Sequence, residues 1–182
     1  MTQNQEPQID ATTAVTTAAP QDRVIFIDID YTLNTEADFE AFNAQGSTGL
    51  PWCLSEVCIT NLNALCAAVP HPRLVLSSTW RLYDRWQWPG ELTAFFRASG
   101  YTGPDITDAT PDLFFLSSTR ADEIRAWLAA HADTTYSYVI LDDMQGADTK
   151  KDRWIKTFSD EGFLADDVPV AVRCLERPMA GE

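Results

Sequence analysis

Short apolar runs alternate with amphipathic stretches from Arg23 onward, and this alternation predicts a βαβ architecture. Three of the runs predict strands, and each ends in polar residues: RVIFID from Arg23, RLVLSS from Arg73 and YSYVILDD from Tyr136. The first run is unbroken, which is typical of a strand covered on both faces. A last strand is predicted at 168–173, VPVAVR. The pattern therefore predicts an α/β fold with a mainly parallel sheet.

Three helices are predicted between these strands. One covers about Glu56–Val69, where apolar side chains recur at helical spacing and Ser55 is the expected N-cap. A shorter helix covers about Glu91–Ser99 and ends at Gly100. The third begins after Thr119, its expected N-cap. Asp122 and Glu123 lie in its first turn, and its apolar face consists of Ile124, Trp127, Leu128 and His131.

Composition divides the chain into a tail and one domain. Residues 1–22 are rich in Thr, Ala, Gln and Pro and have no periodic apolar face, so they are predicted to be a disordered tail. Residues 23–182 are long enough and apolar enough for one catalytic domain. Neither a membrane-spanning run nor a signal-peptide pattern is present, so we expect a soluble cytoplasmic protein that does not bind membranes.

The chain is acidic, with a formal net charge of −14 at pH 7. Such a charge excludes long-range attraction to nucleic acid or to anionic membranes as a global property. An anionic partner must therefore meet a local basic patch or a metal ion.

Four cysteines, Cys53, Cys58, Cys66 and Cys174, form no CxxC pair and have no histidines at zinc-finger spacing. We therefore expect buried reduced thiols in preference to a metal site or disulfides.

Polar residues follow all three predicted buried strands: Asp28 and Asp30, Ser77 and Ser78, and Asp142 and Asp143. Because ligands of an open parallel sheet bind at the carboxyl ends of its strands, these clusters are expected to meet in one crevice. Each pair alone is also compatible with a helix cap or a solvated turn, but acids recur on two strands. Carboxylates gathered without histidine suit Mg²⁺, and one beside the metal is placed to attack a phosphorus centre.

Three ordered motifs resemble those of the haloacid dehalogenase-like (HAD) superfamily: DIDYTLN its first motif, LVLSS its second and VILDD its fourth. The additional stretches LVLSSTWR, DATPDL and TRADEIRAWL are most similar to the small HAD domains found in RNA-repair proteins. The resemblance implies a three-layer Rossmann-like fold. Tyr31 departs from that branch, which usually has Gly at this position.

The resemblance also implies roles for single residues. Asp28 would be the nucleophile that forms an aspartyl-phosphate, and Asp30 the general acid and base. The implied ligands of Mg²⁺ are side chains of Asp28, Asp30, Asp142 and Asp143, with the main-chain carbonyl of Ile29. Thr32 would steady the loop, and Ser77 would bind a phosphoryl oxygen. The full set of expected substrate-binding residues is Thr32, Ser77, Ser78, Arg81 and Arg120.

The third family motif, usually a lysine, has no direct match, because all three lysines follow the fourth motif. Arg120 is the expected substitute, since it opens the helix that precedes YVILDD and a cation there would share phosphate charge. Arg125, Lys150 and Lys151 stay as alternatives, and Arg120 is also compatible with an exposed helix surface.

The segment WRLYDRWQWPG, residues 80–90, concentrates aromatic and guanidinium groups after the second strand. Such groups either stack a base and bind a phosphate, or pack as a cluster at the edge of the core. Arg81 is the better candidate for a functional arginine, because it directly follows the second motif.

Short connections after the first two motifs leave no room for a large cap domain. We therefore expect an open Mg²⁺-dependent phosphatase that accepts a phosphorylated small molecule, a nucleotide or a nucleic-acid end. Two alternatives stay open: a module that binds a phosphorylated ligand or a partner without turnover, and phosphotransfer to an acceptor other than water.

Overall fold

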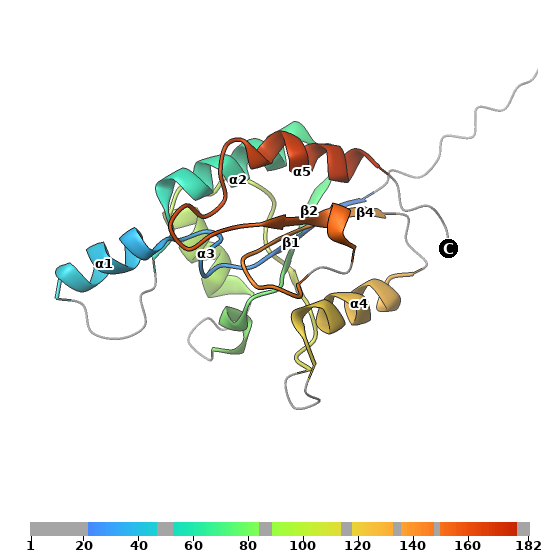
Figure 1. Ribbon diagram of the computed structural model, residues 1–182, viewed down its shortest axis with the longest axis horizontal. Coiled ribbons are helices and arrows are strands. Elements are labelled where there is room, and N and C mark those ends of the chain that lie inside the picture. The colour runs from blue at the N-terminus through green and yellow to red at the C-terminus, as the bar shows by residue number, and fades with distance from the viewer. Residues whose placement is uncertain are drawn as a thin grey trace, which may run out of the picture.

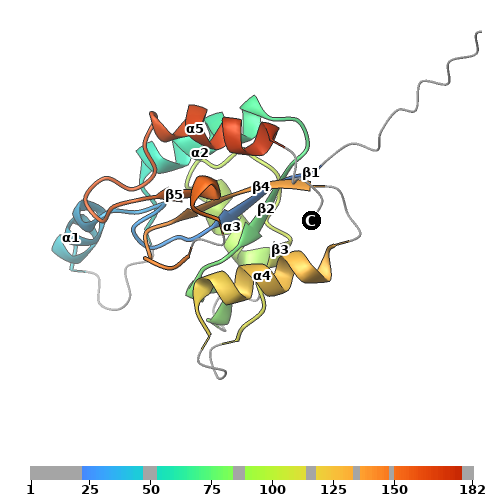
Figure 2. The same cartoon turned by 45° about the vertical axis from the view of Figure 1, so that its right-hand side comes forward.

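A computed structural model describes residues 22–46, 53–83, 89–113, 118–132, 136–147 and 150–177. Its centre is a parallel sheet of five strands in the order β3-β2-β1-β4-β5 (Figures 1 and 2). The strands are β1 (Asp22–Ile27), β2 (Pro72–Leu76), β3 (Asp108–Ala109), β4 (Tyr136–Asp142) and β5 (Trp154–Lys156). Because all five run in the same direction, their carboxyl ends share one edge of the sheet.

Helices cover both faces of the sheet and complete three layers (Figures 1 and 2). Helices α2 (Glu56–Ala68) and α5 (Asp167–Glu176) lie side by side on one face, and α4 (Arg120–Ala130) lies on the other. Helix α3 (Gly90–Ala98) adds Leu92 and Phe96 to the core under α2 and α5. Helix α1 (Glu36–Ala44) buries no residue and projects from the body (Figure 1). The α/β fold with a parallel sheet is thus confirmed.

Alternate residues of the central strand β1 feed two separate cores. Ile25 and Ile27 face α2, α3 and α5, whereas Val24 and Phe26 face α4. All four side chains are at most 1% exposed. This two-sided burial explains why β1 reads as an unbroken apolar run, since a strand with one solvated face would alternate with polar residues.

The two predicted N-caps, Ser55 and Thr119, are confirmed. The hydroxyl of Ser55 accepts a hydrogen bond from the Cys58 N–H at the start of α2. Thr119 and Asp122 form a capping box at the start of α4: each side chain accepts a hydrogen bond from the other residue's backbone N–H. Both caps provide partners for backbone N–H groups that have none within the first turn of a helix.

The predicted strand at 168–173 is wrong, because this segment lies inside α5. Its β-branched residues suggested a strand, yet Ala171, Cys174 and Leu175 follow helical spacing and are the residues that the helix buries. Pro169 is compatible with the helix because it lies in the first turn, where its missing N–H would have no partner. The strand next to β4 at this edge of the sheet is β5, whose three residues are too few for a periodic signal. The pattern also missed α1 and β3.

Several expectations fall on or near undescribed residues. The predicted tail lies outside the described residues except for Asp22, which begins β1. Within the described parts of 28–56 and 77–120, no separate cap domain is present.

All four cysteines are free thiols, three of them buried and Cys53 half-buried. In the described residues, no helix has the length and apolar character needed to cross a membrane.

Candidate active site

Three of the predicted acids meet at the carboxyl edge of the sheet. Carboxylate oxygens of Asp28, Asp142 and Asp143 all lie within 4.8 Å of one another. Backbone hydrogen bonds fix the strand ends that bear them: the Asp28 N–H donates to the Leu141 carbonyl at 3.0 Å, and the Ser77 N–H donates to the Ile27 carbonyl at 2.8 Å. The polar clusters at the ends of β1, β2 and β4 are thus neighbours in space, as the topology required.

Asp28 is held by contacts to both of its carboxylate oxygens. Its Oδ1 accepts a hydrogen bond from the Ile29 N–H at 2.7 Å, and its Oδ2 lies 3.4 Å from Nη2 of Arg120. A further hydrogen bond comes from the hydroxyl of Ser78. The residue is only 5% exposed. Asp28 therefore presents a fixed, largely dehydrated carboxylate.

Asp142 is fully buried and only partly satisfied. Its Oδ1 accepts a hydrogen bond from the Met144 N–H at 2.8 Å, whereas its Oδ2 accepts no hydrogen bond from the described residues. The nearest cation to that oxygen is Nε of Arg120, an ion pair at 3.3 Å. Asp143, next along the chain, is half-buried. A buried carboxylate oxygen without a donor is costly unless another ligand supplies a partner.

Arg120 lies between two of these acids. Its side chain, 7% exposed, contacts Asp28 through Nη2 and Asp142 through Nε. The capping box of Thr119 fixes the first turn of α4, on which Arg120 is the first residue. The guanidinium is therefore directed at the carboxyl ends of β1 and β4 by the start of one helix.

The balance of charge in this cluster is negative, because one guanidinium faces three carboxylates. Burial raises the pKa of Asp28 above its usual 3.8, and the nearby Arg120 does not cancel that effect. Burial, and then the charge of Asp28, raise the pKa of Asp142. Burial raises the pKa of Asp143 in the same direction. All three groups would ionise more readily if a further positive charge were present.

The donor set fits Mg²⁺. The cluster offers carboxylate oxygens with no imidazole or thiolate, which is the chemistry that a hard cation prefers. Oδ2 of Asp142, which accepts no hydrogen bond from the described residues, is an available ligand atom. Asp28, Asp142 and Asp143 are the residues that would hold the ion. Asp30, also expected as a ligand, is not part of this three-residue cluster.

The carbonyl of Ile29, another expected ligand, is engaged in a turn instead. It accepts hydrogen bonds from the N–H groups of Thr32 and Leu33, at 3.2 and 2.8 Å. This turn brings Tyr31 to a φ of 58°, the left-handed region that glycine adopts most easily. The strain is offset by a 2.7 Å hydrogen bond from the Tyr31 N–H to Asn34 and by an edge contact of its ring with Phe39.

Asp30 lies in the same turn and is half-buried. Its Oδ1 accepts a hydrogen bond from Asn34 Nδ2 at 3.2 Å, and its Oδ2 accepts one from the Trp80 indole at 3.0 Å. Trp80 itself is 3% exposed. Of the two interpretations of the aromatic segment, packing therefore describes Trp80, whereas Trp86 and Trp88 lie outside the described residues.

The residues expected to bind substrate have diverse partners. The hydroxyl of Ser77 is buried and has no hydrogen-bond partner among the described residues. Ser78 caps a short 3₁₀ helix, Thr79–Leu82, by accepting from the Trp80 N–H. Thr32 shares a 2.9 Å hydrogen bond with Thr157 at the end of β5, which steadies the loop. Ser77 is thus the hydroxyl best placed to take a new partner.

The guanidinium of Arg81 binds other groups of the protein. Its Nη2 forms a 2.8 Å ion pair with Glu123, and its guanidinium also donates to the carbonyls of Ser78 and Pro111. Its side chain is only 5% exposed. Arg81 therefore ties the end of β2 to α4, and its expected role in substrate binding gains no support from this geometry.

Two of the alternatives to Arg120, Arg125 and Lys151, have exposed side chains. Arg125 is exposed and pairs with Asp122 on α4. Lys151 is exposed on a short 3₁₀ helix, Lys151–Arg153.

Sequence reasoning missed Asn34 and Trp80 as partners of Asp30. The only signal for Asn34 was its presence in the first motif, and none distinguished Trp80 from its aromatic neighbours.

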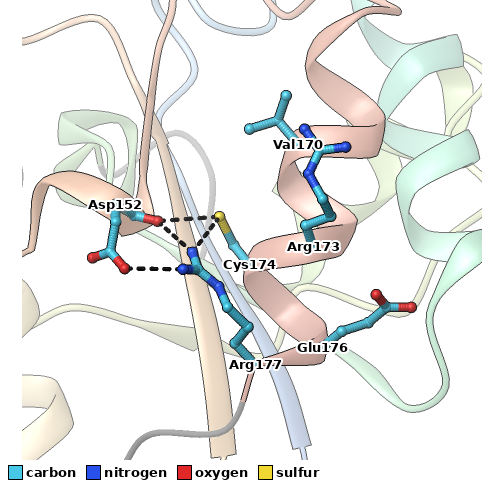
Figure 3. Close-up of a pocket in the computed structure, with 6 residues that line it drawn as sticks. All are labelled: Asp152, Val170, Arg173, Cys174, Glu176 and Arg177. Atoms are coloured by element: carbon cyan, nitrogen blue, oxygen red, sulfur yellow. Dashed lines mark hydrogen bonds and ion pairs between the residues drawn. The ribbon is translucent and has the colours of Figure 1, made fainter.

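A separate pocket of about 390 Å³ is lined by Asp152, Val170, Arg173, Cys174, Glu176 and Arg177 (Figure 3). Figure 3 shows Arg177 turned toward Asp152, with which it forms a 3.2 Å ion pair. No acid of the carboxyl edge lines this pocket. The hollow is therefore not where the chemistry of the acids would take place.

Comparison with known proteins identifies one family. Residues 24–168 match the family described as the HAD domain in Swiss Army Knife RNA repair proteins. The matched range begins within β1 and ends early in α5, so it includes every acid of the site. No curated protein and no solved structure matches the chain.

Proposed function

This chain belongs to the family of HAD domains in Swiss Army Knife RNA repair proteins, and on that basis we propose that it is a Mg²⁺-dependent phosphomonoesterase. The observation that carries the proposal is the meeting of Asp28, Asp142 and Asp143, the first two of which contact the guanidinium of Arg120. Acids on separate strands gain nothing from such proximity unless a cation or a phosphoryl group uses it.

The proposed reaction begins at Asp28. One carboxylate oxygen attacks the phosphorus, and the bond from phosphorus to the ester oxygen breaks. Asp30 donates a proton to that leaving oxygen. Asp30 then takes a proton from water, whose oxygen attacks the aspartyl-phosphate, so that inorganic phosphate leaves and Asp28 is restored.

Positive charge and hydrogen-bond donors support this sequence. Mg²⁺ bound to Asp28, Asp142 and Asp143 would neutralise charge on the phosphoryl oxygens during transfer. Arg120 would share the same charge while keeping Asp28 in position. Ser77, whose hydroxyl has no hydrogen-bond partner among the described residues, would donate to a phosphoryl oxygen.

We propose a terminal phosphate of a polynucleotide or nucleotide as the substrate. The family description names RNA repair proteins, and the described residues form no cap domain that would enclose the site. The net charge of −14 opposes extended contacts with nucleic acid, so recognition of a short terminal segment is expected.

The test is phosphate release from a phosphorylated oligonucleotide, a nucleoside monophosphate and a sugar phosphate. We expect release with Mg²⁺ and less than about one hundredth of that rate with excess EDTA. Weaker binding of the oligonucleotide at higher salt would support the polynucleotide end, whereas a flat response would favour a small substrate. Binding of these compounds without any release would instead contradict the proposal.

Asp142→Asn should stabilise the metal-free protein while removing its response to Mg²⁺. Since the pKa of Asp142 is raised in the fold, the folded state holds more protons than the unfolded state once the pH exceeds about 4. Stability therefore falls as pH rises, and the amide removes that loss. At pH 7.5 we expect the free energy of unfolding to rise by on the order of 1 kcal/mol.

Urea denaturation with and without Mg²⁺ measures both effects. The wild type should gain stability from Mg²⁺, and Asp142→Asn should not. Asp160→Asn, at an exposed position on the loop after β5, is the matched control and should behave as the wild type. An Asp142→Asn variant that Mg²⁺ still stabilises to the wild-type extent would contradict the assignment of this residue as a ligand.

A further inference from the structure

The carboxylate of Asp30 is held at both oxygens by side chains that the proposed reaction does not otherwise use. Trp80 Nε1 donates to Oδ2 at 3.0 Å, and Asn34 Nδ2 donates to Oδ1 at 3.2 Å. Two donors on different oxygens fix the plane of a carboxylate as well as its position. Asp30 therefore has one defined orientation at the rim of the crevice.

Trp80 is a rigid partner for this contact. Its side chain is 3% exposed and belongs to the core under α2, α3 and α5. Its ring packs against Phe95 with centroids 6.1 Å apart, and its backbone N–H donates to the hydroxyl of Ser78. A buried indole in a fixed rotamer keeps the direction of its N–H, whereas an exposed side chain would lose it to motion.

The chemistry of the indole adds a constraint. An indole N–H only donates, so Oδ2 of Asp30 can act toward it only as an acceptor. The proton that Asp30 gives to a leaving oxygen must therefore be carried on a carboxylate lone pair that neither Trp80 nor Asn34 uses. The hydrogen bonds from these two side chains fix the direction of that lone pair.

We infer that Trp80 is a positioning residue for Asp30, holding its carboxylate so that the proton is delivered to the leaving oxygen. The inference rests on the proposed function, because it presumes that Asp30 transfers this proton. Asn34 contributes to the same orientation but also contacts the Tyr31 N–H and the Cys53 carbonyl, so its replacement would disturb the turn. Trp80 allows the cleaner experiment.

The experiment compares two substrates with Trp80→Phe. p-Nitrophenyl phosphate has an acidic phenol as its leaving group, which departs without a proton, whereas a nucleoside 3′-monophosphate releases an alkoxide that needs one. For the nucleoside monophosphate, we expect kcat/KM to fall by about 10- to 100-fold, part of what general acid catalysis contributes. For p-nitrophenyl phosphate the fall should be less than about threefold.

The chain supplies a matched control in Trp127→Phe. Trp127 is also 3% exposed, and its Nε1 also donates to a carboxylate at 3.0 Å, in this case Asp108. Asp108 lies in β3 and is not part of the acid cluster. Trp127→Phe therefore removes an equivalent hydrogen bond from the fold and should change kcat/KM for the two substrates by the same small factor.

A second variant separates the lost hydrogen bond from the lost volume. Replacing Trp80 with 3-benzothienylalanine keeps the bicyclic shape and exchanges only the N–H for sulfur. It should show the same discrimination between substrates as Trp80→Phe, with a melting temperature close to that of the wild type.

The outcomes are distinct. Equal losses for both substrates in the benzothienylalanine variant, or no loss for either, would overturn the inference while leaving the phosphatase assignment intact. A wild type that hydrolyses neither substrate and releases no phosphate from a phosphorylated oligonucleotide would overturn the proposed function, and the inference with it.

Discussion

Asp28→Asn should reduce phosphate release by at least about 10⁴-fold, the scale expected when a covalent nucleophile is removed. The amide keeps the size of the side chain and its acceptor for the Ile29 N–H, yet its nitrogen cannot form the aspartyl-phosphate. The stability of the folded protein should not fall, because burial already opposes the ionised form of Asp28. Steady-state release of phosphate measures the effect, with circular dichroism as a check on folding.

Asp160→Asn is again the control, since it is the same chemical change at an exposed position outside the acid cluster. It should retain wild-type rates. Turnover by Asp28→Asn within about tenfold of the wild type would rule out covalent catalysis by this residue.

Arg120→Ala should lower kcat by about 10²- to 10³-fold and destabilise the protein. The first effect follows from losing a charged donor at the phosphoryl group. The second follows because Asp28 and Asp142 lose the guanidinium that contacts both, and removal of one partner from a buried ion pair costs on the order of 3 kcal/mol.

The loss of stability should depend on pH. Without Arg120 the pKa values of the two acids rise further, since this cation lowers both. The folded state then holds still more protons than the unfolded state. The loss of stability caused by Arg120→Ala therefore grows as pH rises above about 4 and shrinks below it. Mg²⁺ should restore part of the stability by supplying positive charge to the same oxygens.

Arg125→Ala is the matched control for Arg120→Ala. Both arginines lie on α4, but Arg125 is 56% exposed and pairs with Asp122 at the surface. Its removal should change the free energy of unfolding by less than about 1 kcal/mol and leave kcat unchanged. Equal effects of the two substitutions would contradict the placement of Arg120 at the site. Arg120→Lys should be intermediate, because a single ammonium cannot reproduce the separate contacts through Nη2 and Nε.

Much of the fold and the acid cluster follows from short-range pattern. A buried strand that ends in acids is unusual enough to be recognised, and a parallel sheet requires the ends of its strands to be neighbours. The Thr119 cap could also be predicted from the sequence, since a hydroxyl three residues before an acid marks a helix start. Arg120 then followed from its position on the first turn.

What the pattern missed depends on contacts between distant residues or on very short elements. Trp80 reaches Asp30 across 50 positions, and nothing in the local sequence sets it apart from other tryptophans that simply pack. Glu123 looked like a first-turn acid but also binds Arg81 on the short 3₁₀ helix after β2. The misassigned α5 shows that β-branched composition is a weaker guide than helical periodicity when a helix packs one face on the core.

The central claim is that Asp28 takes up the phosphoryl group, and trapping the intermediate tests it most directly. The protein is mixed with Mg²⁺ and p-nitrophenyl phosphate, quenched within milliseconds, and reduced with borohydride, which converts an aspartyl-phosphate to homoserine. Mass spectrometry of the peptide around β1 should find homoserine at position 28 and aspartate at position 30. Unmodified Asp28 in an enzyme that turns over rapidly, or homoserine at another position, would contradict the account.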